Sequence, residues 1–330
     1  MDKLRLRFEI KSFLGVLASW RWMGLFLLVS RVWGQEASVV RIGYQPSSSV
    51  LLVGKAKGIY EEEFAKVGAK VLWVPFLSGP VMIEAAAGDR VDLMGVGNMP
   101  AIVARAGGID VKVIAKAAFN PATNAVLVRP NSPIRSLGDL KGKKIAAQVG
   151  SSVHYFLYQL LTPLGLSMGD VELVNLAGPD QGPALMGGDV DAIVLWMPYR
   201  TQLEKAGKAR VLADSAHVPG GLSLYAVRNA FGTRYSPLVE AFLRATRKTN
   251  DFMRRHPKEA LELLAQASQF PKEVLAESLK GFDWSMELTD RDIREMKDIK
   301  DFLRTNGVIR KDFQIEDLFD KSFLEKARIP

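Results

Sequence analysis

The chain has 330 residues, a formal net charge of +8 and no cysteine. Its length and its ordinary balance of 48% hydrophobic and 24% charged residues predict a globular protein of two lobes, each able to bury a core. The lack of cysteine excludes disulfides, thiolate metal sites, cysteine nucleophiles and a lipid-modified cysteine anchor. The three histidines lie far apart without a metal-binding spacing, and we expect no metal and no cofactor.

Residues 1–34 carry half of the net charge, with six basic and two acidic side chains. Two apolar runs, 13–20 and 22–29, follow the basic start, and Val32 and Gly34 precede Gln35. This order is typical of a signal peptide over residues 1–34, cleaved near Gly34/Gln35. The alternative is a retained membrane anchor, which Arg21 in the middle of the span disfavours. We therefore expect a periplasmic protein. The remaining charges are spread along the chain, so nucleic acid is not an expected partner.

Strand and helix patterns alternate from residue 39 onward. The first part predicts strands at 39–44, 71–75, 92–97 and 111–118, with helical sequence through 57 and at 60–67, 79–87 and 99–105. The rhythm breaks at Pro121, and an extended stretch follows at 125–128. It then restarts with strands at 144–148, 171–176, 191–196 and 210–213, and helices at 151–161, 179–186 and 198–205. This alternation predicts parallel α/β sheets with helices on both faces.

The last third is extended at 222–227 and is expected to be helical from Ser236 nearly to the end. One helix begins at Thr289, with Asp292 as its capping-box partner, and Gly307 ends it. Its expected buried stripe is Ile293, Met296, Ile299, Phe302 and Leu303. Two extended connectors, near 119–126 and 219–226, divide the chain into a first lobe (35–122), a second lobe (123–222) and a return to the first lobe (223–330). Two lobes joined by two crossover segments form a hinge with a cleft between them.

Familiar enzyme motifs do not match. Gly95-Val96-Gly97 lacks the third glycine of a dinucleotide fingerprint, and the segment 138–143 is one residue short of a P-loop and favours a helical turn. There is no nucleophile elbow. The acidic residues of 287–301 alternate with basic ones, which is typical of a solvated helix face.

Four strand ends share a pattern of small or hydroxyl residues followed by a helix start, at 77–80, 95–98, 148–152 and 195–198. Ligands of open α/β sheets bind at the carboxyl ends of the strands, and free N–H groups at a helix start attract anions. Each place alone favours simple N-capping, but four of them in both lobes favour a site for a compact oxyanion. Trp196 is a platform for an apolar tail or part of the core. His154 faces the cleft, or it caps its helix or belongs to the core. The candidate ligand-binding residues are Gln45, Ser78, Gly79, Gly97, Asn98, Gly150, Ser151, Ser152, His154, Trp196 and Met197.

Five segments carry a family resemblance: RIGYQ at 41–45, SGP at 78–80, DLMGVGNMPAIVA at 92–104, the stretch from NSPIRSLGDLKGKK to HYFL at 131–157, and GDVDAIVLWMPY at 188–199. In this order the sequence resembles the nitrate/sulfonate/taurine substrate-binding proteins of ABC importers, especially the aliphatic sulfonate-binding branch. The resemblance implies a two-lobe type II periplasmic-binding-protein fold and delivery of ligand to an ABC permease. Family ligand contacts would fall at Gln45, Ser78, Gly97, Asn98, Gly150, Ser151, Ser152 and Trp196.

The expected function is non-enzymatic binding of a small organic anion, best an aliphatic sulfonate, by a monomer. Met197 stands where family members often have an acidic residue, which disfavours taurine because its ammonium would lose a partner. One alternative is an enzyme resembling the pyrimidine-precursor synthases of thiamine biosynthesis, which the export signal and the lack of cysteine oppose. Another is a receptor-associated ligand sensor, which the sequence does not separate from a transport protein.

Overall fold

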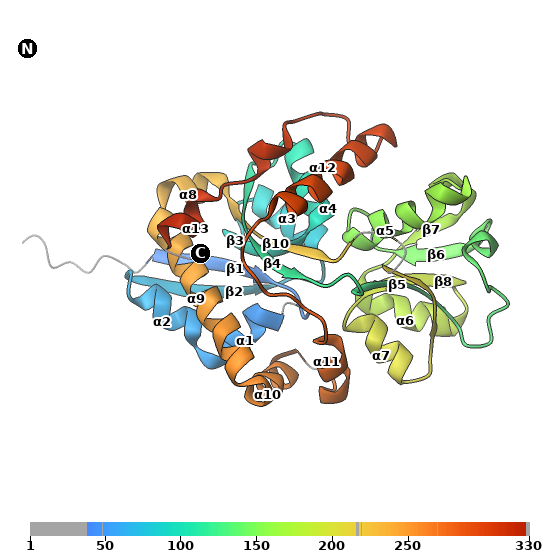
Figure 1. The fold of residues 1–330 in the computed structure, drawn as a ribbon, viewed down its shortest axis with the longest axis horizontal. Coiled ribbons are helices and arrows are strands. Elements are labelled where there is room, and N and C mark those ends of the chain that lie inside the picture. Colours follow the sequence, from blue (N-terminus) through green and yellow to red (C-terminus); the bar gives the residue numbers. More distant parts are fainter. Residues whose placement is uncertain (1–37, 48, 216–217, 219, 269, 328–330) are drawn as a thin grey trace, which may run out of the picture. The chain divides into compact units, whose positions relative to one another are not determined.

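The computed structural model describes residues 38–327 except 48, 216–217, 219 and 269. The expected signal peptide, residues 1–34, lies outside the described residues. Two five-stranded sheets organise the described chain (Figure 1), with strand orders β2-β1-β3-β10-β4 and β7-β6-β8-β5-β9. We call each sheet with its covering helices a lobe. Within the described residues, no helix is both long and apolar enough to cross a membrane.

Both sheets are mixed, so the expectation of purely parallel sheets is wrong at the strands beside the crossovers. In the first sheet β1 (Ser38–Tyr44) pairs in parallel with β2 (Ala69–Pro75) and β3 (Leu93–Gly97), whereas β10 (Leu222–Arg228) runs antiparallel to β3 and to β4 (Val111–Phe119). β10 starts beside the end of β4, because Leu222 pairs with Phe119. A strand that enters a sheet at the carboxyl ends of its neighbours must run against them.

The second sheet repeats this arrangement. β6 (Lys144–Ala147) pairs in parallel with β7 (Glu172–Asn175) and β8 (Ala192–Trp196). β5 (Asn124–Val128) enters antiparallel beside β8, with Asn124 opposite Trp196, and pairs on its other side with β9 (Arg210–Asp214). The described strands and helices follow the predicted alternation closely, apart from these directions.

Helices cover both faces of each sheet, as expected. On the first sheet, α3, α4 and α12 bury one apolar cluster around Met82, Met99 and Met296, and α2 and α9 bury another around Phe64 and Phe242. The helices are α1 (Ser49–Lys57), α2 (Ile59–Ala65), α3 (Gly79–Ala87), α4 (Asn98–Ala106), α5 (Ser152–Leu161), α6 (Gly178–Gly187), α7 (Tyr199–Lys205), α8 (Asn229–Arg234), α9 (Ser236–Arg255), α10 (Pro257–Ser268), α11 (Lys272–Ser278), α12 (Asp290–Thr305) and α13 (Ser322–Lys326).

The α12 prediction is confirmed in its details. Thr289 and Asp292 form the capping box, with the Asp292 carboxylate accepting from the Thr289 N–H at 2.9 Å. Met296, Ile299 and Leu303 are buried, and Ile293 and Phe302 pack partly buried against the same cluster. The expectation that this helix face is solvated is wrong at Lys300, whose side chain is buried. Its ammonium is satisfied there, because it donates to Asp312 at 3.0 Å and to the Phe313 carbonyl at 3.1 Å.

The chain after Ser236 is less helical than expected, because residues 280–288, between α11 and α12, form a turn at 280–281 that is followed by a nonhelical stretch. We call this segment the arm. It lies along the outer edge of β4, where the Phe119 N–H donates to the Asp283 carbonyl at 2.8 Å and the Lys116 N–H donates to the Met286 carbonyl at 3.0 Å. An edge strand offers unpaired backbone groups, and the arm satisfies part of them.

The two crossovers between the sheets meet at Asn120 and Gly221. The Asn120 N–H donates to the Gly221 carbonyl at 3.2 Å. Gly221 has a φ of +93°, and a Cβ built there would lie 1.8 Å from the Asn120 carbonyl oxygen. Only glycine allows both this backbone conformation and this approach. The division into lobes at residues 122/123 and 222/223 stays a prediction.

Candidate ligand-binding site

A cavity of about 150 Å³ lies at the carboxyl ends of the strands of both sheets. Its walls come from the ends of β1, β3 and β8, the starts of α1, α3, α4 and α5, the crossovers, β4, β10 and the arm. Among the described residues, no charged side chain lines it. The lining residues are Gln45, Ser47, Ser49, Val50, Leu51, Gly79, Gly95, Val96, Gly97, Pro100, Ala117, Ala118, Thr123, Asn124, Ser151, Ser152, Val153, Trp196, Met197, Gly221, Leu222, Ser223, Tyr225, Phe282 and Trp284.

Seven of the eleven candidate residues line this cavity: Gln45, Gly79, Gly97, Ser151, Ser152, Trp196 and Met197. They come from five separate stretches of the chain, which the sheets bring together because their strands end at the cleft. Ser78, Asn98, Gly150 and His154 are not among the lining residues. Each of these four is the sequence neighbour of a lining residue.

Three helices start at the cavity, and in one of them, α4, the Asn98 side chain accepts from the first-turn N–H of Met99. The N-cap residues of α3, α4 and α5, which are Ser78, Gly97 and Ser151, make no capping hydrogen bond, and none of the three helices has an acidic residue in its first turn. Ser151 instead donates to the Gln148 carbonyl at 2.6 Å. The first turns of α3 and α5, which no side chain caps, leave N–H groups and the positive end of the helix dipole available. The cavity is therefore suited to an anion despite its lack of cationic side chains.

Ser78 and Asn98 differ in how their polar atoms are satisfied. Ser78 is fully buried, and its hydroxyl has no hydrogen-bond partner among the described residues. The Asn98 side-chain oxygen accepts from the Met99 N–H at 2.8 Å and from the Ser152 hydroxyl at 2.7 Å. Its amide donates to Glu295 at 3.4 Å. Burial, which outweighs the Asn98 hydrogen bond, raises the pKa of Glu295.

Gly97 and Ser152 meet across the lobes. A Cβ built on Gly97 would lie 2.2 Å from the Ser152 hydroxyl oxygen, closer than real Cβ atoms approach. Together with the Ser152–Asn98 hydrogen bond, this contact joins the start of α5 to the start of α4. Glycine at 97 thus permits the close approach of the lobes at the cavity.

His154 supports the turn that precedes α5. Its Nδ1 accepts from the N–H of Gly150, which has a φ of +80°, at 3.3 Å. The imidazole is 5% exposed, and burial lowers its pKa to about 4. The imidazole is therefore neutral, and its Nδ1 can accept the Gly150 N–H at the start of the helix.

The apolar side of the cavity is aromatic. Trp196 is half-buried and meets Tyr199 edge to face, with ring centroids 5.8 Å apart. Beside it, the Met197 N–H donates to the Thr123 carbonyl at 3.0 Å. Gln45 donates to the Gly95 carbonyl at 3.3 Å.

Tyr225, Phe282 and Trp284 also line the cavity but are not among the candidate residues predicted from the sequence. Tyr225 lies on β10, where it is buried. Phe282 and Trp284 belong to the arm, which was expected to be helical. The alternation of apolar and polar residues at 282–286, Phe-Asp-Trp-Ser-Met, is a two-residue period that indicates an extended segment and was the available signal.

Two mixed α/β lobes joined by two crossovers, with a ligand-sized cavity at the ends of their strands, define a protein of the periplasmic-binding fold. The chain belongs to the NMT1/THI5-like family, whose model matches residues 45–260.

Several relatives are similar over most of the chain. A Bacillus subtilis (strain 168) protein named for binding aliphatic sulfonates is 35% identical over 297 residues, 89% of each chain. An Escherichia coli (strain K12) protein with the same naming is 31% identical over 73% of this chain and 75% of its own. The solved structure of the alkanesulfonate-binding protein SsuA from Xanthomonas axonopodis pv. citri bound to MOPS superposes with a TM-score of 0.81. That pair is 28% identical, covering 87% of this chain and 99% of SsuA.

Proposed function

We propose that this protein is an extracytoplasmic solute-binding protein that captures an organic sulfonate in the cavity between its lobes. The observation that carries the proposal is the meeting of three helix starts, of which α3 and α5 have no side-chain cap, at a cavity that no charged side chain of the described residues lines. A sulfonate is permanently anionic and offers only acceptor oxygens. Backbone N–H groups and serine hydroxyls match it without an ammonium or guanidinium partner.

The proposal assigns the anionic group to the first turns of α3 and α5. Gly79 and Ser152 line the cavity there, and the unpartnered hydroxyl of Ser78 lies at the N-cap of α3. Ligand contacts from both lobes would favour the conformation in which the lobes approach. The relatives named for sulfonate binding, and the SsuA structure that holds the sulfonate MOPS, support this assignment.

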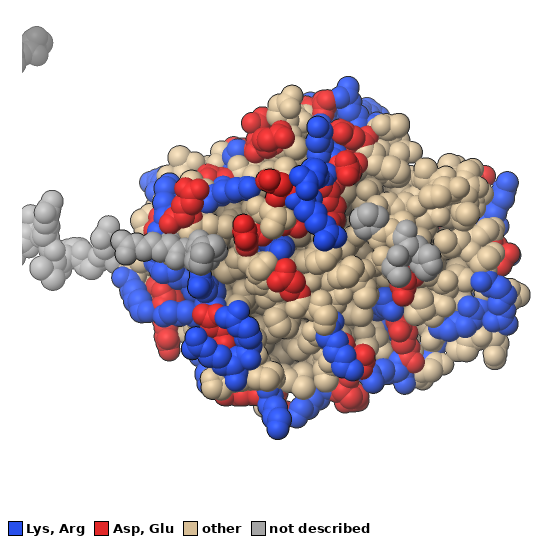
Figure 2. Space-filling model, in the orientation of Figure 1, with Lys and Arg blue, Asp and Glu red and all other residues tan. Residues whose placement is uncertain are grey.

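The same proposal covers the setting in which the protein works. The chain is exported after cleavage near Gly34/Gln35, binds its ligand as a monomer without chemical change, and delivers it to an ABC permease. On the face seen in Figure 2, basic and acidic side chains are interspersed, which supports a small-molecule partner rather than nucleic acid. The residues of the two sheets support a second lobe over 123–222.

Titration calorimetry of the exported protein tests the ligand class, with butanesulfonate, butyrate and sulfate as titrants. We expect butanesulfonate to bind at least tenfold tighter than the other two, because the cavity presents both oxyanion donors and an aromatic wall. Binding of butyrate with equal or greater affinity, or no binding of any sulfonate, would overturn the proposal. Mass spectrometry of the recovered ligand tests the absence of catalysis, since a chemically altered sulfonate would show an enzyme.

A further inference from the structure

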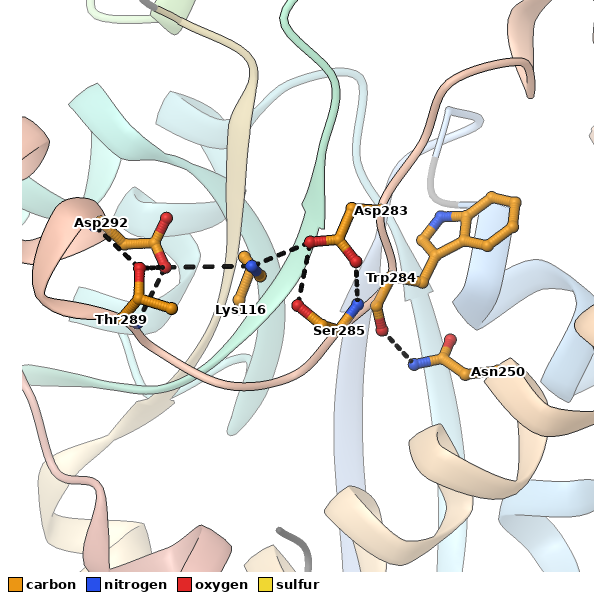
Figure 3. Close-up of polar contacts among 7 residues, drawn as sticks. All are labelled: Lys116, Asn250, Asp283, Trp284, Ser285, Thr289 and Asp292. Atoms are coloured by element: carbon orange, nitrogen blue, oxygen red, sulfur yellow. Dashed lines mark hydrogen bonds and ion pairs between the residues drawn. The ribbon is translucent and has the colours of Figure 1, made fainter.

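The arm, residues 280–288, presents two aromatic rings to the cavity. The rings of Phe282 and Trp284 are stacked, with centroids 6.0 Å apart and planes 8° from parallel, and both line the cavity. In Figure 3 the indole of Trp284 points away from the side chains of Asp283 and Ser285. This is the alternation of an extended chain, in which neighbouring side chains face opposite sides.

The opposite face of the arm is tied to a buried lysine. Lys116, on β4, is 5% exposed. Its ammonium lies 3.0 Å from the Asp283 carboxylate and 3.9 Å from the Asp292 carboxylate that caps α12. Asp283 also accepts from the Ser285 N–H at 2.8 Å and from its hydroxyl at 2.9 Å. A buried ammonium requires such partners, so Lys116 and Asp283 hold each other in place.

Two further contacts hold the arm at its start and beside Trp284. The Asn250 amide, from α9, donates to the Trp284 carbonyl at 2.9 Å. The Asn120 amide, from the first crossover, donates to the Lys280 carbonyl at 3.0 Å. The backbone that carries both rings is thus hydrogen-bonded to β4, α9 and a crossover. A wall held at this many points presents a defined shape to a ligand.

We infer that Trp284, together with Phe282, determines which ligand tails the protein accepts, and that the Lys116–Asp283 ion pair positions this wall. The inference rests on the proposed function and names its substrate class: sulfonates whose alkyl or aromatic tail is long enough to reach the arm. An apolar tail gains affinity from each methylene that it buries and from contact with aromatic faces. Methanesulfonate has no such tail, so its affinity depends on the oxyanion donors alone.

Two ligands separate the tail from the anionic group. In Trp284→Ala we expect the affinity for hexanesulfonate to fall at least tenfold, while the affinity for methanesulfonate changes less than threefold. Trp284→Phe, which keeps an aromatic face, is expected to retain most of the hexanesulfonate affinity. An equal loss for both ligands would show that the arm only supports the fold, and no loss for either would remove it from the site. Either result overturns the inference.

Asp283→Asn tests the positioning role without removing a cavity residue. Its carboxylate is half exposed, so the variant is expected to fold, which thermal melting checks. We expect a three- to fivefold loss of hexanesulfonate affinity with methanesulfonate unchanged. Glu259→Gln is the matched control, because its ion pair with Lys57 has a similarly exposed carboxylate and lies on α10. Equal hexanesulfonate affinities in the two variants would refute the positioning role. Wild-type protein that binds neither sulfonate would instead refute the proposed function.

Discussion

The contact between Gly97 and Ser152 places a requirement on a single side chain. Gly97 leaves no room for a Cβ beside the Ser152 hydroxyl, and that hydroxyl donates to Asn98 across the lobes. Glycine in this position usually suggests a flexible backbone. Here glycine is required for steric reasons. The backbone conformation of Gly97, with φ of −76° and ψ of 171°, is one that any residue can adopt.

Gly97→Ala should therefore weaken butanesulfonate binding at least tenfold, because the added methyl group keeps the two helix starts apart. The loss in the double variant Gly97→Ala/Ser152→Ala should be smaller than the sum of the losses in the two single variants, since it removes the atom that the methyl group meets. Calorimetry measures both, and non-additivity of this kind is the mark of residues in contact. Gly138→Ala serves as the control, because a Cβ there meets only Ser136 Oγ, at 3.7 Å. Fully additive losses would contradict the steric explanation.

Met197, which lines the cavity, is expected to select against sulfonates that carry an ammonium group. A ligand ammonium beside Met197 loses water and finds no carboxylate among the lining residues, at a cost above about 1 kcal/mol. We expect butanesulfonate to bind at least tenfold tighter than taurine, and Met197→Asp to narrow that ratio. Competition measured by thermal shift compares the two ligands on both proteins. Tighter taurine binding by the wild type would contradict this view of the cavity.

At the scale of elements, α5 combines an open N-terminus with a buried histidine in its first turn. Burial lowers the pKa of His154 to about 4, below the ordinary value of about 6.5. The neutral ring accepts the Gly150 N–H, which fixes the glycine turn before the helix. The start of α5 is therefore sensitive to protonation, although His154 does not line the cavity.

The lowered pKa of His154 makes the stability of the folded chain depend on pH. Between pH 6.5 and pH 4 the unfolded chain binds a proton at residue 154 that the folded chain does not, so the free energy of unfolding falls as the pH falls. The loss is up to about 3 kcal/mol for a depression of this size. Urea denaturation at pH 7 and pH 4.5 should show a smaller loss for His154→Gln than for the wild type. His256→Gln, at an exposed residue, is the control and should not reduce the loss.

At the scale of the whole described chain, the lobes share more than the two crossovers. α11 packs against α7, and Phe270 meets Tyr199 edge to face with centroids 5.1 Å apart. The apolar cluster beneath them contains Val50 and Leu52 of α1 together with Ala125 and Leu195 of the second sheet. The segment that returns to the first lobe thus also contacts the second lobe.

Gly221 allows the two crossovers to approach each other closely. Gly221→Ala should lower the free energy of unfolding by about 2 kcal/mol or more, because it combines a φ of +93° with a Cβ only 1.8 Å from the Asn120 carbonyl oxygen. Urea denaturation measures the change. Gly220→Ala is the control one residue earlier, where the nearest atom to a Cβ is 3.7 Å away. Equal stability of the two variants would show that the crossovers separate easily.

The amino-acid sequence alone determined the local elements and the helix starts that line the cavity. Strand and helix periodicities, the Thr289–Asp292 capping box and the Gly150-Ser151-Ser152 helix start depend on residues close together in the chain. Such patterns are visible because hydrogen bonds and burial repeat every two or every 3.6 residues. Seven of the candidate residues line one cavity, because the carboxyl ends of parallel strands meet at one edge of a sheet.

Only the tertiary structure decided what depends on distant partners. β5 and β10 run antiparallel because the chain enters each sheet at the cleft, and no local pattern of Val126 or Leu224 carries that direction. Asn98 accepts a hydrogen bond from Ser152, 54 residues away, and is not among the lining residues. Trp284 faces the cavity because β4 had a free edge and Lys116 needed a carboxylate there. These contacts form between segments far apart in sequence, where burial and pairing override local preference.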